Sequence, residues 1–277
     1  MVETAPTKNE SETLFETYLR EHGFKEWDFE PKTEGKTRRP DYRIAFQGAP
    51  HYFEVKEFRQ EDRRSLHEGS AGAFDPYAPI REKIDAAREK FREYKEYPCS
   101  IVLYNVDAPL VFLDDWTVVM GAMLGDLGYR FAVDPKLGAA VGDFTHTFTQ
   151  RGKMINYKRM EPQNTTISAV VALDKFPLGQ RRLNAHWRSE EKESGRKMDW
   201  SEFVKYAESL RSKSVDASEV VLRVVVFENP YSRISLPREL FTGPFDERFG
   251  PEGDNIVRCY AGGGILRVEE EEAILLG

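Results

Sequence analysis

The chain has 277 residues, which is enough for one large domain or two small ones. Hydrophobic residues make up 40% and charged residues 31%, a composition that excludes disordered, collagen-like and coiled-coil proteins. The best apolar run, Trp116–Leu124, is too short to cross a bilayer, and the N-terminus has no signal-peptide pattern. Because the chain also has only two cysteines, we expect a cytoplasmic protein without a membrane segment.

The net charge of −7 is concentrated near the C-terminus. Residues 246–277 contain eight acidic residues and three arginines, so the first 245 residues carry a net charge of only −2. A nearly neutral body is compatible with a local basic groove for nucleic acid, but it does not demonstrate one.

The N-terminal part of the chain predicts a helix followed by three extended segments. Apolar residues at helical spacing indicate a helix over Ser11–Glu21, and an extended stretch follows at Trp27–Phe29. Two strands are expected over Asp41–Phe46 and His51–Phe58, and the four residues 47–50 between them suit a hairpin loop.

A second helix is predicted to begin at Pro79 and to end by Pro98, and the apolar run Ser100–Val106 indicates a buried strand. Residues 1–106 are therefore expected to form a core, which residues 107–277 extend with further strands and helices of the same α/β domain. Among these later elements, helices are predicted at Asp115–Leu124 and Trp200–Leu210, and strands at Thr166–Leu173 and Glu219–Phe227.

The predicted hairpin carries the residues that are suited to catalysis or metal binding. Glu54 and Lys56 are two residues apart and share one face of a strand, whereas Phe53 and Val55 point the other way, into a core. With a four-residue loop, Asp41 faces Lys56 and is a diagonal neighbour of Glu54, with Cα atoms roughly 7–8 Å apart. Two carboxylates beside an ammonium suit a hard cation such as Mg²⁺, which can polarise a phosphoryl oxygen and activate water.

Pro40-Asp41, followed after twelve residues by Glu54 and Lys56 with one residue between them, resembles the signature of the PD-(D/E)XK nuclease superfamily. The predicted order of elements over the first 106 residues resembles its restriction-endonuclease-like αβββαβ core, which has a mixed central sheet. The resemblance implies a nuclease that uses Mg²⁺ or Mn²⁺, an endonuclease acting on DNA in preference to RNA. Asp41 and Glu54 would then ligate the metal, and Lys56 would act on the attacking water or on the developing charge.

Members of this superfamily often have a further acidic residue on the first helix, and Glu12 and Glu16 are the candidates here. Helical geometry places Glu12 nearer to the apolar stripe, so it is the predicted third metal ligand. The alternative for Glu12 is a capping box with Asn9 at the start of the helix.

Phosphate contacts could come from basic residues around the motif and on the second helix, although each could equally be a solvated surface charge. These residues are Lys36, Arg38, Arg39, Arg59, Arg63, Arg64, Arg81 and Lys83. The turn-rich and aromatic segment 228–249 is expected to be an ordered surface segment that could carry partner or substrate specificity.

Two other functions remain open from the sequence. One is a catalytically silent module that binds nucleic acid or protein on the same fold, and the other is a metal-dependent hydrolase of a small phosphoester. The complete set of Asp41, Glu54 and Lys56 favours an enzyme. One-metal and two-metal catalysis, and assembly as a homodimer, are all compatible with these residues.

Overall fold

The computed structural model of the chain describes four stretches, residues 8–60, 74–211, 216–252 and 255–260. Within them the chain forms two compact units. The first contains residues up to Asp174 together with residues from Val224 onward, and the second is Lys175–Arg223. None of the helices in these stretches is long and apolar enough to span a membrane.

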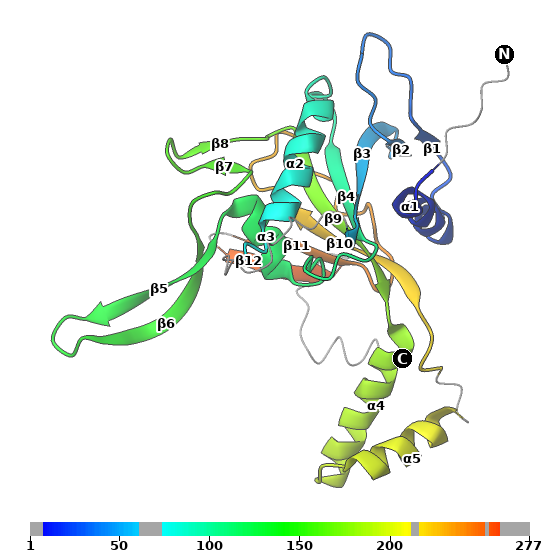
Figure 1. Ribbon diagram of the computed structural model, residues 1–277, viewed down its shortest axis with the longest axis vertical. Helices are drawn as coiled ribbons and strands as arrows, with labels where there is room; N and C mark the ends of the chain where they lie inside the picture. The colour runs from blue at the N-terminus through cyan, green and yellow to red at the C-terminus, as the bar shows by residue number, and fades with distance from the viewer. Residues whose placement is uncertain (1–7, 61–73, 212–215, 253–254, 261–277) are drawn as a thin grey trace. The chain divides into compact units, whose positions relative to one another are not determined.

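An eight-stranded mixed sheet is the central element of the fold (Figure 1). Its strands are β1 (Trp27–Phe29), β2 (Tyr42–Phe46), β3 (Ala49–Phe58), β4 (Cys99–Asn105), β9 (Ile167–Phe176), β10 (Val221–Glu228), β11 (Glu247–Glu252) and β12 (Asn255–Tyr260). They are adjacent in this same order. The β3/β4, β4/β9 and β10/β11 pairs are parallel, and the β1/β2, β2/β3 and β11/β12 pairs are antiparallel.

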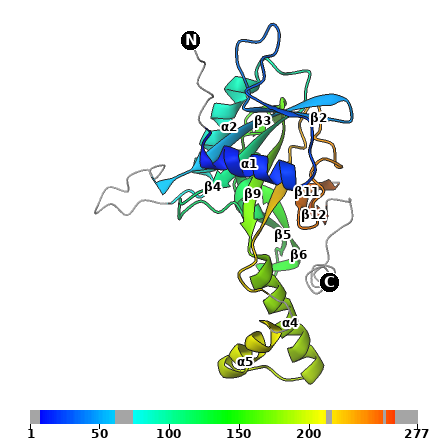
Figure 2. The ribbon, with the colours of Figure 1, turned by 90° about the vertical axis from the view of Figure 1, so that its right-hand side faces the viewer.

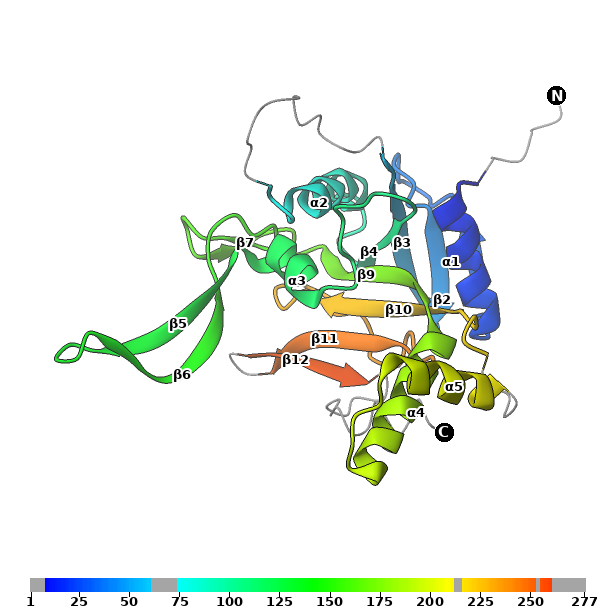
Figure 3. The same ribbon diagram turned by 60° about the horizontal axis from the view of Figure 1, so that its bottom comes forward.

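The strands predicted late in the chain extend the same sheet as the early ones, because β9 pairs with β4 and β10 lies next to β9 (Figure 3). The remaining strands form two small sheets, β5 (Leu127–Asp134) with β6 (Ala139–Phe148) and β7 (Ile155–Asn156) with β8 (Glu161–Pro162). The helices are α1 (Glu10–Glu21), α2 (Ala78–Phe91), α3 (Trp116–Leu124), α4 (Leu178–Ser194) and α5 (Trp200–Arg211).

Helices cover both faces of the β2–β3–β4 part of the sheet (Figures 1 and 2). On one face, the ring of Phe15 from α1 lies 5.9 Å from the ring of Phe53 in β3. On the other face, the ring of Tyr52 lies 4.6 Å from that of Tyr94, just after α2. The alternation of side chains along β3 therefore directs odd-numbered residues toward α1 and even-numbered residues toward α2.

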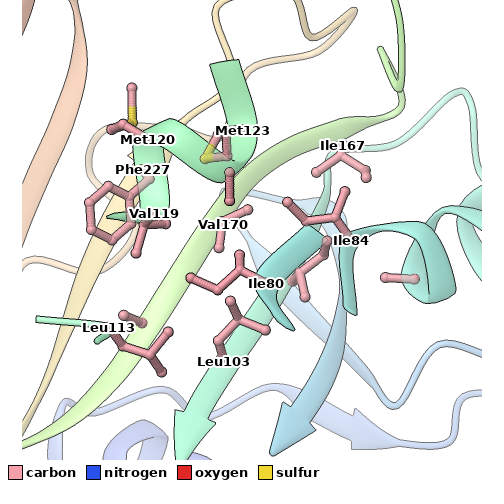
Figure 4. Packing of buried hydrophobic residues seen from close by; sticks show 14 of the residues in the cluster. Ile80, Ile84, Leu103, Leu113, Val119, Met120, Met123, Ile167, Val170 and Phe227 are labelled. Carbon is pink, nitrogen blue, oxygen red and sulfur yellow. The ribbon is translucent and has the colours of Figure 1, made fainter. Parts of the chain in front are cut away.

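The larger apolar core lies between the sheet and the helices α2 and α3 (Figure 4). Ile80 and Ile84 are one turn apart on α2 and fully buried, and they belong to one cluster with Leu103, Val119 and Val170. This packing holds α2 against the sheet and so determines where the last turn of the helix lies.

The segment between β10 and β11 is packed into the protein, so the expectation of a surface segment is wrong for its central residues. Leu240 and Phe241 are 0% and 1% exposed. The ring of Phe241 lies 5.8 Å from that of Tyr18 and 5.7 Å from that of Phe53, on the α1 side of the sheet. Phe241 therefore forms part of the core on the face of the sheet that α1 covers.

Helix α1 begins with the capping box that the sequence left as an alternative for Glu12. The Asn9 side chain accepts a hydrogen bond from the Glu12 amide at 2.8 Å, and the Glu12 carboxylate accepts one from the Asn9 amide at 2.8 Å. Asn9→Ala should lower the free energy of unfolding by about 1 kcal/mol, measured by urea denaturation. Glu21→Ala, at an exposed position of the same helix, should change it by less than about 0.5 kcal/mol. Equal losses in the two variants would contradict a stabilising cap.

Candidate active site

The turn between β2 and β3 is tighter than the predicted four-residue loop. Gln47 and Gly48 form the turn, and both have positive φ values, 50° and 78°, as a type I′ turn requires. Phe46 therefore pairs with Ala49 instead of His51. The register moves by an even number of residues, so every side chain stays on its predicted face.

This register places Asp41 and Glu54 directly opposite each other. Tyr42 pairs with Phe53, and Asp41 and Glu54 are the next residues outward on the two chains. The predicted diagonal arrangement is therefore wrong, and the two carboxylates are closer than expected. One oxygen of Asp41 also accepts a hydrogen bond from the Val55 amide at 2.8 Å, which holds its side chain against β3.

Glu54 is the most enclosed residue of the cluster. Its side chain is 0% exposed, and its Oε1 accepts a hydrogen bond from Lys56 Nζ at 2.5 Å. Its Oε2 is buried and has no hydrogen-bond partner among the described residues. As the alternation along β3 predicts, Glu54 and Lys56 project from the same face of the sheet.

A second lysine, Lys90, completes the cluster. This residue was not predicted from the sequence. Its Nζ lies 2.9 Å from Asp41 Oδ1 and 2.6 Å from Glu54 Oε1. Lys90 is in the last turn of α2, whereas the sequence had indicated Arg81 and Lys83 near the start of that helix. The structure thus brings together two carboxylates from the β2–β3 hairpin and two ammonium groups.

The groups of this cluster have perturbed protonation equilibria. Burial raises the pKa of the Glu54 carboxyl, and the Asp41 carboxylate raises it further, whereas Lys56 and Lys90 lower it. Burial acts to lower the pKa of Lys90, but the hydrogen bonds and the charges of Glu54 and Asp41 outweigh it and raise this pKa. Such perturbed groups are typical of functional sites, although structural ion-pair networks also produce them.

Glu12 is held by the helix cap and is not bonded to this cluster. One of its oxygens accepts the hydrogen bond from Asn9, and α1 packs on the face to which Phe53 points, opposite to the face of Glu54. Burial raises the pKa of Glu12, the bond from Asn9 lowers it, and the Asp41 charge raises it again. Glu12 therefore interacts electrostatically with Asp41 while its carboxylate serves the cap.

Glu16 is more buried than helical geometry had suggested. It is 4% exposed, and it accepts hydrogen bonds from the Tyr42 hydroxyl at 3.1 Å and from Arg20 at 2.9 Å. Lys8 forms a further ion pair with it. These partners make Glu16 a structural residue that joins α1 to β2.

The cluster offers two carboxylates to a cation. Among the residues that the structure describes, no group of three or more His, Cys, Asp or Glu is placed to hold a metal ion. Mg²⁺ often binds through one or two carboxylates and keeps several water ligands. Asp41 and Glu54, with the unpartnered Oε2 of Glu54 as an additional acceptor, fit this kind of site.

Several of the basic residues predicted to contact phosphates form ion pairs within the protein. These pairs are Lys36–Glu96 at 2.5 Å, Arg38–Glu89 at 3.2 Å, Arg59–Glu57 at 2.6 Å and Arg81–Asp126 at 2.7 Å. The Arg81 side chain is only 8% exposed, so it is part of the interior and not of a binding surface. Arg63 and Arg64 lie outside the described residues.

No family model matches this chain, and neither a curated protein nor a solved structure does so. The fold itself is an α/β architecture with a large mixed sheet. Over Glu10–Asn105, its elements follow the order α1-β1-β2-β3-α2-β4 that the sequence predicted. The side chains of the site are therefore the basis for inferring the function.

Proposed function

We propose that the protein is a nuclease that depends on a divalent metal and hydrolyses phosphodiester bonds. The observation that carries this proposal is the convergence of Asp41, Glu54 and Lys56 on one face, with Glu54 fully buried. Their resemblance to the PD-(D/E)XK signature supports it. By the same resemblance, we propose DNA in preference to RNA as the substrate and internal cleavage as the reaction.

Each of the three residues has a distinct role in this proposal. Asp41 and Glu54 would hold Mg²⁺ or Mn²⁺, which when bound supplies a Lewis acid and an activated water. The hydrogen bond from the Val55 amide keeps Asp41 oriented for this task. Lys56, whose side chain is 26% exposed, would orient the attacking water or offset negative charge on the phosphate. Glu12, whose Oε2 accepts the hydrogen bond from Asn9, would contribute a third carboxylate through its other oxygen.

A cleavage assay tests the proposal directly. Supercoiled, linear and single-stranded DNA and a structured RNA would each be incubated with the protein in Mg²⁺, Mn²⁺ or EDTA. Cleavage that requires the metal supports a nuclease, and circular substrates would reveal internal cuts. Binding without cleavage of any substrate would instead favour a catalytically silent module.

Lys56→Met should reduce the rate of cleavage by about 10²–10³-fold, the usual effect of removing one group that stabilises developing charge. The affinity for Mn²⁺, measured by calorimetry, should not fall, because the substitution leaves both carboxylates, Asp41 and Glu54, in place. Lys95→Met, which removes an exposed lysine beyond α2, should cleave at the wild-type rate. Unchanged activity in Lys56→Met would remove this lysine from the mechanism.

A further inference from the structure

We propose that Lys90 competes with the metal for the site. Its ammonium binds one oxygen of each of the two carboxylates that would hold the cation, and metal binding displaces it. This inference rests on the proposed function, since it concerns the same pair of carboxylates, Asp41 and Glu54. It adds a residue that controls how tightly the site binds its metal.

The position of the Lys90 ammonium carries the inference. It is 2.9 Å from Asp41 Oδ1 and 2.6 Å from Glu54 Oε1, so it bridges the two carboxylates as a shared cation would. Lys56 differs, because its bond within the cluster is to Glu54 and not to Asp41. A metal ion that binds both carboxylates can use the unpartnered Oε2 of Glu54. On Asp41 it competes with Lys90 for Oδ1, because Oδ2 already accepts the hydrogen bond from the Val55 amide.

Charge balance explains why both cations would not stay. Asp41 and Glu54 supply two negative charges, and Lys56 and Lys90 supply two positive charges, so the cluster is neutral without a metal. A divalent ion added to it would create an excess of two positive charges in a partly buried site, where repulsion is weakly screened. Release of Lys90 toward solvent reduces this excess, and its side chain, at 35% exposure, already reaches the surface.

The alternative is that Lys90 has only a structural role. Basic residues are favoured in the last turn of a helix, where they interact with the carbonyl end of the helix dipole, and α2 has both Arg88 and Lys90 there. A purely structural Lys90 would influence the stability of the protein but not its affinity for a metal. The two explanations therefore differ in a quantity that can be measured without any substrate.

Calorimetric titration with Mn²⁺ tests the competition. Lys90→Met, which keeps the length of the side chain and removes its charge, should bind Mn²⁺ about tenfold more tightly than the wild type. Lys95→Met removes the charge of an exposed lysine five residues further along and should bind like the wild type. Asp41→Ala should remove the binding, which identifies the site. Without metal, Lys90→Met should also melt at a lower temperature, because the facing carboxylates lose their shared cation.

Lys90→Gln provides a second variant if Lys90→Met does not fold, because the amide can still donate a hydrogen bond. Tighter Mn²⁺ binding in a folded Lys90 variant would support the competition. Wild-type binding that depends on Asp41 but is unchanged or weakened in both Lys90 variants would overturn it and leave the proposed function intact. Absence of Mn²⁺ binding from the wild type and from both variants would overturn the competition together with the metal-dependent function.

Discussion

Glu54→Gln is expected to reduce metal-dependent cleavage by about 1000-fold, which corresponds to ~4 kcal/mol of transition-state stabilisation. The substitution preserves the shape of a side chain that is completely buried, but it removes the charge that would hold the metal. The variant should remain folded, because the amide oxygen can still accept a hydrogen bond from Lys56 or Lys90 and both of these lysines are partly exposed to water. Its melting temperature in EDTA is expected to stay within a few degrees of the wild-type value.

Glu57→Gln is the matched control for this experiment. Glu57 is on the same strand, and the alternation along β3 directs it to the opposite face from Glu54. It undergoes the same chemical change and should retain the cleavage rate of the wild type. If Glu54→Gln and Glu57→Gln cleaved equally well, the activity would come from another site or from a contaminating nuclease, and the proposed role of Glu54 would be wrong.

The sequence predicted the elements of residues 10–105 well because their apolar residues follow clear periods. The helix predicted over Ser11–Glu21 is α1, and the extended stretch at Trp27–Phe29 is β1. Several later elements were missed. In β5, Phe131, Ala132 and Val133 form an apolar run without the alternation of a half-buried strand, and all three are exposed. Strand β11 contains a glycine and a proline, which normally interrupt strands.

The site was predictable where it depends on local geometry. Because the turn has two residues, the β2–β3 register differs from the predicted register by two positions. Asp41 and Glu54 still converge, because an even shift preserves the face of every side chain. Lys90 was not predictable in this way, since its contact with the hairpin depends on how α2 packs on the sheet. The available signal was its position beside Phe91, at the edge of the buried stripe of the helix.

Phe241 shows how tertiary packing can override a local preference. Its φ of 67° is in the left-handed region, which bulky residues rarely adopt and which costs of order 1–3 kcal/mol. The ring is nevertheless almost completely buried, within 6.5 Å of Phe15 and 5.8 Å of Phe24. Contacts with residues more than two hundred positions earlier therefore hold this conformation, and no local pattern could have predicted them.

Phe241→Ala is accordingly expected to lower the free energy of unfolding by about 3–5 kcal/mol, the usual cost of removing a buried aromatic ring. Urea denaturation would measure this loss. Phe131→Ala is the matched control, because the Phe131 side chain is 46% exposed and its removal should cost less than about 1 kcal/mol. Similar losses for the two phenylalanines would show that the segment between β10 and β11 does not support the α1 side of the sheet.

A third substitution separates the backbone strain at Phe241 from the packing of its ring. Phe241→Gly removes the same ring as Phe241→Ala, but glycine adopts a positive φ without steric cost. At an ordinary position, glycine would be the less stable of the two by roughly 0.5–1 kcal/mol, because it has more conformational freedom to lose. Here Phe241→Gly should be at least as stable as Phe241→Ala. A clearly less stable glycine variant would mean that this residue does not have a left-handed backbone in solution.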